Sequence, residues 1–107
     1  MFEKYKKDGK VAILVSYGFG AGWSTWNSEN LAQLAMDKRL VEAKLKGVDE
    51  EEIEVILKDM GLEDTYAGGW DQVEIEWLYE GTAFEIDEYD GAESLRKITS
   101  ISDFTIA

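Results

Sequence analysis

The chain has 107 residues, of which 45% are hydrophobic, and a formal net charge of −12, so we expect a single domain, residues 1–107, with one hydrophobic core. It contains no cysteine and no histidine, which excludes disulfides, thiolate zinc sites and catalysis by serine–histidine or cysteine–histidine pairs. No apolar run is long enough to cross a membrane, and the N-terminus lacks the apolar region of a signal peptide, so we expect a soluble cytoplasmic protein without membrane contact.

The charged residues are distributed unevenly along the chain. Residues 1–48 carry eight Lys/Arg and five Asp/Glu, whereas residues 49–90 carry one Lys/Arg and sixteen Asp/Glu. Proteins that bind DNA or RNA present a basic stripe, so we do not expect direct nucleic acid binding. The acidic block 49–90 is either a solvated face or a surface that imitates nucleic acid towards a basic partner protein.

The first half of the chain predicts one strand followed by helices. Residues 1–8 are polar and are expected to form a flexible or edge segment. The apolar, β-branched run that follows predicts a central strand near 10–17, buried on both faces. Helical spacing of apolar residues, with Asn27 as a cap, then predicts either one helix over 29–46 or two helices, the second capped by Asp37.

A further helix is predicted at residues 49–60, with most of its acidic residues in solvent. Asp49 and Glu52 have the spacing of a capping box, and Gly61 is a typical stop signal.

Alternating patterns in the second half of the chain predict β-strands. Residues 71–79 and 83–89 are expected to pair as an antiparallel hairpin with a carboxylate-rich outer face, and a weaker strand is expected near 94–101. The predicted fold class is therefore α+β, with a small mixed or antiparallel sheet of about four strands and two or three helices on one face.

Residues 17–27, named here the Gly/Trp turn, combine three glycines with two tryptophans. Trp23 stands where a dinucleotide fingerprint needs its third glycine, and no lysine precedes Ser24 or Thr25 as a phosphate-binding loop requires. Glycines, amides at a helix start, hydroxyl groups and flat rings nevertheless suit a nucleotide-like or phosphate-bearing ligand. The predicted ligand-binding residues are Gly18, Phe19, Gly20, Gly22, Trp23, Ser24, Thr25, Trp26 and Trp70. Tyr66 is an alternative to Trp70 as the ring that completes the pocket.

The two tryptophans of the turn admit a second interpretation. Their three-residue spacing suits one face of a helix, so Trp23 and Trp26 equally fit rings that cover the core. The sequence leaves both interpretations open.

Carboxylates of the predicted hairpin are candidates for a metal or catalytic site. An EF-hand is excluded because Ile86 and Lys97 stand where acids are required. Glu74, Glu76, Glu85 and Asp87 fit either an exposed acidic strand face or a magnesium site of a phosphodiesterase-like enzyme. We expect the former, and therefore assign no metal, cofactor or catalytic residue.

Several sequence blocks in a fixed order resemble a widespread family of small bacteriophage proteins. The resemblance covers roughly residues 10–95 and rests on residues 18–27 (GFGAGWSTWN), 66–69 (YAGG), 76–78 (EWL), 80–82 (EGT) and 88–91 (EYDG). It implies a phage accessory protein that acts in the host bacterial cytoplasm, and it supplies no catalytic residues.

The chain departs from the family pattern at two positions. A proline often follows the acid equivalent to Asp37, and another often precedes the Glu-Gly-Thr turn, where this chain has Lys38 and Tyr79. The first difference removes one signal for a helix break at Asp37, and the second leaves the turn less rigid.

Three functions are compatible with these features. The first is a non-enzymatic counter-defence protein that binds a nucleotide-like ligand in the Gly/Trp turn, as a sponge for immune signals does. The alternative is an acidic protein–protein inhibitor of a basic host factor through residues 49–90. The third is a magnesium-dependent phosphodiesterase. A homo-oligomer is compatible with the first, because a pocket shared between copies would raise its affinity.

Overall fold

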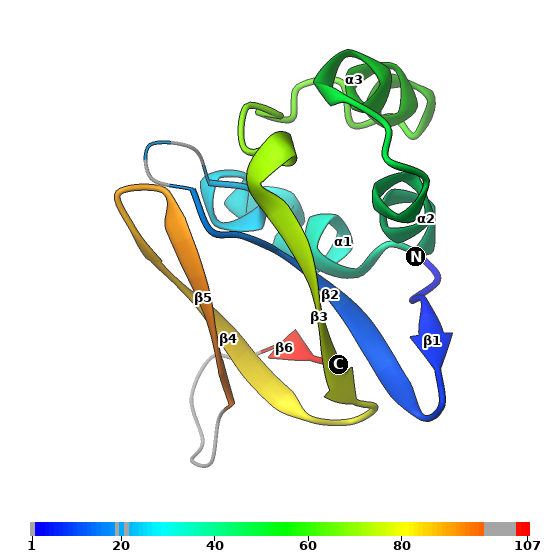
Figure 1. The fold of residues 1–107 in the computed structure, drawn as a ribbon, viewed down its shortest axis with the longest axis vertical. Helices are drawn as coiled ribbons and strands as arrows, with labels where there is room; N and C mark the ends of the chain where they lie inside the picture. The colour runs from blue at the N-terminus through cyan, green and yellow to red at the C-terminus, as the bar shows by residue number, and fades with distance from the viewer. Residues whose placement is uncertain (1, 19, 21, 98–104) are drawn as a thin grey trace.

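The computed structural model describes residues 2–18, 20, 22–97 and 105–107, and Figure 1 shows how they are arranged. Within them, two antiparallel sheets accompany three α-helices, so the α+β prediction is confirmed. The first sheet has the order β1 (Lys6–Lys7), β2 (Lys10–Ser16), β3 (Val73–Tyr79), and the second has β5 (Ala92–Lys97), β4 (Ala83–Tyr89), β6 (Thr105–Ile106). The helices are α1 (Leu31–Met36), α2 (Lys38–Lys46) and α3 (Glu50–Asp59), with short 3-10 turns η1 (Ser24–Trp26), η2 (Ser28–Asn30) and η3 (Trp70–Gln72). None of these described helices is both long and apolar enough to span a bilayer.

The fold is organised around β2, which runs between the helices and the second sheet (Figure 1). Its residues 11–15 are completely buried, as the sequence predicts for this strand. Ala12 and Leu14 point into a first core, shared with the helices, whereas Val11, Ile13 and Val15 point into a second core against β4. Burial on both faces explains why polar and apolar residues do not alternate along this strand.

The predicted hairpin between residues 71–79 and 83–89 is wrong. β3 pairs with β2 along its whole length, and β4 pairs with β5 and β6 in the other sheet. β3 contributes Val73 to the first core and Leu78 to the second, whereas Phe84 of β4 packs in the second. Gly81, with φ 89°, reverses the chain between the two sheets. Two alternating strands on either side of a turn therefore belong to different layers. The strand predicted near 94–101 is observed at 92–97, and residues 98–101 lie outside the described part of the chain.

The polar N-terminal segment forms an edge strand, one of its two predicted states. Lys6 and Lys7 pair with the start of β2, and the carbonyl of Tyr5 accepts a hydrogen bond of 3.0 Å from the backbone N–H of Ala12. This short strand covers only the beginning of β2.

The helical segment is divided at Asp37, which confirms the two-helix alternative. The Asp37 carboxylate accepts hydrogen bonds from the backbone N–H of Arg39 at 2.9 Å and from its guanidinium at 2.8 Å, and its own backbone leaves the helical conformation (ψ 127°). The break therefore forms without a following proline. The predicted cap at Asp49 and stop at Gly61 are also present, because Asp49 accepts from the N–H of Glu52 and Gly61 has a φ of 78°.

We expect Asp37 to make stability depend on pH in the acid range. Burial raises the pKa of Asp37, but hydrogen bonds from Arg39 and Gln33 outweigh burial and bring the pKa below its ordinary value. A lowered folded-state pKa gives a contribution that is complete above the unfolded pKa, about 3.9, and is lost as pH falls through the folded value.

The test compares the wild type with Asp37→Asn by urea unfolding at neutral pH and at successively lower pH. The variant should be less stable by about 1–2 kcal/mol at neutral pH, and this gap should narrow below about pH 4. A gap that stays constant down to the lowest pH at which the protein is folded would contradict the assignment.

Candidate functional site

Trp23 and Trp70 lie in the first core. Both side chains are fully buried, and their ring centroids are 5.2 Å apart. The indole N–H of Trp23 donates to the carbonyl of Leu34 at 2.7 Å, and that of Trp70 donates to the carbonyl of Val48 at 2.8 Å. These two predicted ligand-binding rings therefore contact the core and not a cavity.

The amides of the Gly/Trp turn bind a carboxylate from the same chain. Glu93 on β5 is 2% exposed. One carboxylate oxygen accepts from the N–H groups of Trp23 (2.8 Å) and Thr25 (3.1 Å) and from the Thr25 hydroxyl (2.6 Å). The other oxygen accepts from the N–H of Ser16 at 2.9 Å. The turn is thus an anion-binding turn, as its composition suggests, and Glu93 occupies it.

The glycines of the turn serve close packing and backbone direction. A Cβ on Gly18 would collide with the Gln72 side chain, and Gly20 has a φ of 80° while its N–H donates to the carbonyl of Asp90. Ser24 is fully buried, and its hydroxyl group lacks a hydrogen-bond partner among the described residues. Phe19 lies outside the described residues.

Trp26, unlike Trp23 and Trp70, reaches the surface. It is 41% exposed and contacts Tyr66, which is 44% exposed, with ring centroids 5.2 Å apart and planes tilted by 40°. A Cβ on Gly22 would lie 2.6 Å from the Trp26 ring, and a Cβ on Gly68 would collide with the Tyr66 ring. Each ring of this pair, named here the Trp26–Tyr66 pair, therefore lies directly over a glycine.

Asn27 joins the turn to the loop that carries Tyr66. Its side-chain amide donates to the carbonyls of Trp23 (2.8 Å) and Tyr66 (3.0 Å), and its side-chain oxygen accepts from the N–H of Tyr66 (2.8 Å). The prediction that Asn27 caps a helix is wrong, because its side chain makes no cap hydrogen bond. The side chain fixes the Trp26–Tyr66 pair instead.

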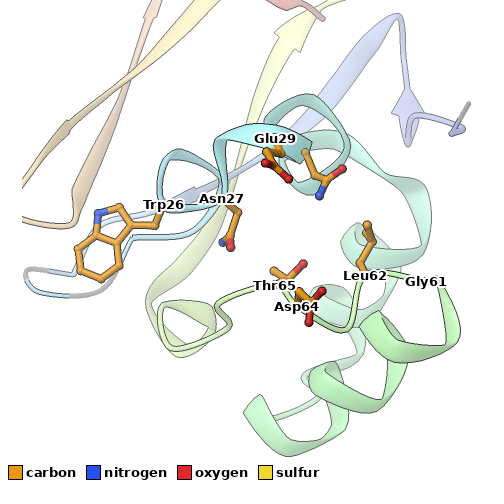
Figure 2. A pocket seen from close by; sticks show the side chains of 8 residues that line it. Trp26, Asn27, Glu29, Gly61, Leu62, Asp64 and Thr65 are labelled. Carbon is orange, nitrogen blue, oxygen red and sulfur yellow. The ribbon is translucent and has the colours of Figure 1, made fainter.

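A cavity of about 350 Å³ is lined in part by Trp26, whose ring points away from Glu29 and Asp64 (Figure 2). One wall comes from η1 and η2, with Trp26 and Glu29, and the other comes from the loop after α3, with Leu62 and Asp64. Figure 2 shows the Glu29 and Asp64 side chains on opposite walls. We name this space the Trp26 cavity.

The strand carboxylates are not brought together. Glu74 and Glu76 lie on β3, whereas Glu85 and Asp87 lie on β4 in the other sheet, where both pair with Arg96 at 2.9 and 3.0 Å. Across the described ranges, no group of three or more acidic side chains is arranged to hold a metal ion. The predicted convergence depended on the hairpin, so the phosphodiesterase hypothesis loses its geometric basis.

Tyr17 and Lys44 have shifted pKa values, and both side chains make contacts within the fold. Burial raises the pKa of Tyr17 above its ordinary value, and a hydrogen bond to Glu76 and the charges of Glu76 and Glu74 raise it further. Burial lowers the pKa of Lys44, whose ammonium group donates to the carbonyl of Trp70 at 2.6 Å and lies 4.4 Å from the centre of its ring. Tyr17 stays protonated, and Lys44 holds Trp70 in place.

Exposed acids form a surface on α3 and the loop after it. This acidic face consists of Glu51, Glu52, Glu54, Asp59, Glu63 and Asp64. The salt bridges of the described residues leave all six without a cationic partner. Lys58 is the only cation between residues 49 and 90. Asp64, one member of the acidic face, also lines the Trp26 cavity.

Comparison with protein-family models, with curated proteins and with solved structures found no match for this chain.

Sequence reasoning missed Glu93, although one signal was present. Residues two apart on a strand share a face, so Glu93 lies on the same face of β5 as Leu95, which packs against the second core. A carboxylate on the inward face of a strand needs buried donors. The contribution of Asp64 and Glu29 to one cavity had no such signal, because their approach depends on how the loop after α3 folds back.

Proposed function

We propose that this chain is an acidic accessory protein that docks on the basic surface of a partner protein. The observation that carries the proposal is the acidic face, whose six exposed carboxylates lack cationic partners among the described residues. An excess of charges of one sign attracts an oppositely charged partner over long range and raises its association rate.

Each salt bridge of the described residues joins a cation to an acid outside the acidic face, which supports this proposal. Arg39 pairs with Asp37, Arg96 with Glu85 and Asp87, and Lys6 with Glu80 at 2.7 Å. The acids of α3 therefore form no salt bridge among the described residues, and Lys58 is the one cation on that helix.

The other leading hypothesis, a nucleotide-like ligand in the Gly/Trp turn, stays a prediction with less support. An anionic ligand would have to displace Glu93 from the amides of Trp23 and Thr25. It would also approach a protein of net charge −12. The same charge that repels a phosphate attracts a basic protein.

In the phage setting that the sequence resemblance implies, the partner is a basic host factor in the bacterial cytoplasm. The chain would act by covering that factor's cationic surface. This corresponds to inhibition by occupancy and needs no catalytic group.

The test is affinity capture from a bacterial lysate, followed by identification of the bound protein and measurement of Kd with the purified partner. Wild type is compared with Glu54→Lys/Glu63→Lys, which reverses two charges of the acidic face. We expect the variant to bind about ten-fold more weakly at about 0.1 M salt. We expect wild-type binding to weaken strongly at about 1 M salt, where the Debye length falls to about 3 Å.

The matched control is Glu42→Lys/Glu74→Lys, which changes the net charge equally at exposed positions outside the acidic face. It should retain affinity close to the wild type. Equal losses in both variants would show a response to net charge alone, and salt-insensitive binding would exclude an electrostatic docking surface.

A further inference from the structure

Strand β3 lies at the edge of the first sheet. Within the described residues it pairs with β2 along its whole length and with no other strand. Above the turn at residues 80–82, β4 and β5 diverge from it (Figure 1). We name the unpaired side of residues 73–79 the β3 edge. A strand of this length with one unpaired side is able to accept a further strand.

The backbone groups on the β3 edge follow from the pairing with β2. The N–H of Tyr17 donates to the carbonyl of Gln72, directly before β3, at 3.2 Å. Since the direction of these groups alternates along a strand, even-numbered residues of β3 face β2 and odd-numbered ones face the edge. The N–H and carbonyl groups of Ile75 and Trp77 are therefore unpaired among the described residues.

The side chains beside this edge differ between the two faces of the sheet. Trp77 and Tyr79 lie on the same face as buried Val73, but they are 37% and 65% exposed. Glu74 and Glu76 lie on the other face, and neither takes part in a salt bridge of the described residues. An added strand would therefore meet aromatic rings on one face and two negative charges on the other.

A second copy of this chain fits the β3 edge poorly. Two such edges that pair antiparallel about a two-fold axis present the same residues to each other. An axis at Glu76 sets this residue opposite itself, and an axis at Ile75 sets Glu74 opposite Glu76. An axis at Trp77 sets Glu74 opposite Glu80. Like charges directly opposite each other are destabilising, so these registers favour a basic strand over a second copy.

We propose that the β3 edge binds an extended basic segment of another protein, which becomes a fourth strand of the first sheet. In the antiparallel arrangement of this sheet, basic side chains of the segment lie beside Glu74 and Glu76, and apolar ones lie beside Ile75 and Trp77. Main-chain hydrogen bonds provide affinity, and the alternation of basic and apolar residues provides specificity. The β3 edge shares no residue with the acidic face, so this inference does not rest on the proposed function.

The edge strand of the second sheet does not offer the same site. Within the described residues β5 pairs only with β4 and so has an unpaired side as well. Its exposed residues include Arg96 and Lys97, which repel a basic segment. The charge of the segment therefore favours β3 over β5.

The test titrates the full chain with a capped eight-residue peptide of alternating lysine and valine at about 0.1 M salt and follows the backbone N–H signals by NMR. The N–H groups of Ile75 and Trp77 should exchange with solvent at least about ten-fold more slowly in the complex, because each gains an acceptor. The N–H of Glu76, which faces β2, should change less. A peptide with glutamate in place of lysine should not bind.

N-methylated peptides separate strand pairing from attraction between charges. The residues opposite Ile75 and Trp77 are valines, and in an antiparallel pair their N–H groups donate to β3. Methylation of all four valine nitrogens should therefore weaken binding at least about ten-fold, whereas methylation of the four lysine backbone nitrogens should change Kd less than about three-fold. Both peptides have the same charge and the same number of methyl groups, and both use the wild-type protein.

Variants of the protein test the two acids. Glu74→Gln/Glu76→Gln keeps side-chain shape and should weaken peptide binding about five-fold. The matched control Glu54→Gln/Glu63→Gln removes two charges from the acidic face and should change affinity less than about two-fold. Urea unfolding checks that both variants are folded.

Three results would overturn the inference. Equal losses with the two methylated peptides would show attraction between charges without strand pairing. Weaker binding in Glu54→Gln/Glu63→Gln but not in Glu74→Gln/Glu76→Gln would place the peptide on the acidic face, in agreement with the proposed function alone. Absence of binding to the lysine–valine peptide would exclude the basic strand from the β3 edge, whereas the proposed function is decided by its own capture experiment.

Discussion

Replacing Glu93 with alanine is expected to destabilise the protein by about 3–5 kcal/mol. The carboxylate accepts four hydrogen bonds in a site that is 2% exposed, from Ser16, Trp23 and Thr25. Removing it leaves three backbone N–H groups and one hydroxyl without their acceptor. For a domain of this size the loss corresponds to a fall in Tm of about 12–25 °C.

Urea unfolding of Glu93→Ala and Glu93→Gln measures the effect. In Glu93→Gln, the amide oxygen can replace only one carboxylate oxygen, so its NH2 group must face a backbone donor, and we expect a loss of about 2 kcal/mol. The control Glu74→Ala removes an exposed carboxylate from β3 and should change stability by less than about 0.5 kcal/mol. A loss below about 1 kcal/mol in Glu93→Ala would contradict the role assigned to this residue.

Glu93 also shows what composition can and cannot predict about the Gly/Trp turn. Glycines and free amides before a helix predict anion binding, and the turn does bind a carboxylate. The source of that carboxylate is set by tertiary structure, because Glu93 is 70 residues from Trp23 in the chain. A local motif cannot tell an external phosphate from an internal side chain.

The strands were predictable, but not their partners. Apolar continuity identifies β2, and alternation identifies β3 and β4, since both patterns are properties of a single segment. Pairing depends on which layer buries each strand. Phe84 and Ile86 of β4 pack in the second core, whereas β3 contributes to both cores, with Val73 in the first and Leu78 in the second. The short turn at residues 80–82 predicted a hairpin, but β3 pairs with β2 in one sheet and β4 pairs with β5 and β6 in the other.

The sequence could indicate a helix break at Asp37, because this one side chain can cap a second helix. A carboxylate that accepts from the N–H two residues later can start a helix without help from proline. The choice between one helix and two needed the further contact with the Arg39 guanidinium, which stabilises the buried charge. Short-range contacts of this kind are visible in sequence, whereas the loop contact between Asn27 and Tyr66 is not.

The two tryptophans of the Gly/Trp turn are expected to differ sharply in their effect on stability. Trp23→Ala should cost about 3–5 kcal/mol, because it leaves a cavity against Trp70 and frees the carbonyl of Leu34. Trp26→Ala should cost about 1 kcal/mol, since its ring is 41% exposed and loses mainly the contact with Tyr66. Urea unfolding followed by far-UV circular dichroism measures both without relying on tryptophan fluorescence.

Trp23→Phe separates ring packing from hydrogen bonding in the same experiment. It keeps an aromatic ring against Trp70 but loses the indole N–H donor, so an intermediate cost of about 1–2 kcal/mol is expected. Nearly equal costs for Trp23→Ala and Trp26→Ala would contradict the division into one core ring and one surface ring. A stability-neutral Trp23→Ala would return Trp23 to the set of ligand-facing residues. If the expected order is found, loss of binding in a Trp23 variant reports unfolding, and Trp26 is the position at which recognition can be tested.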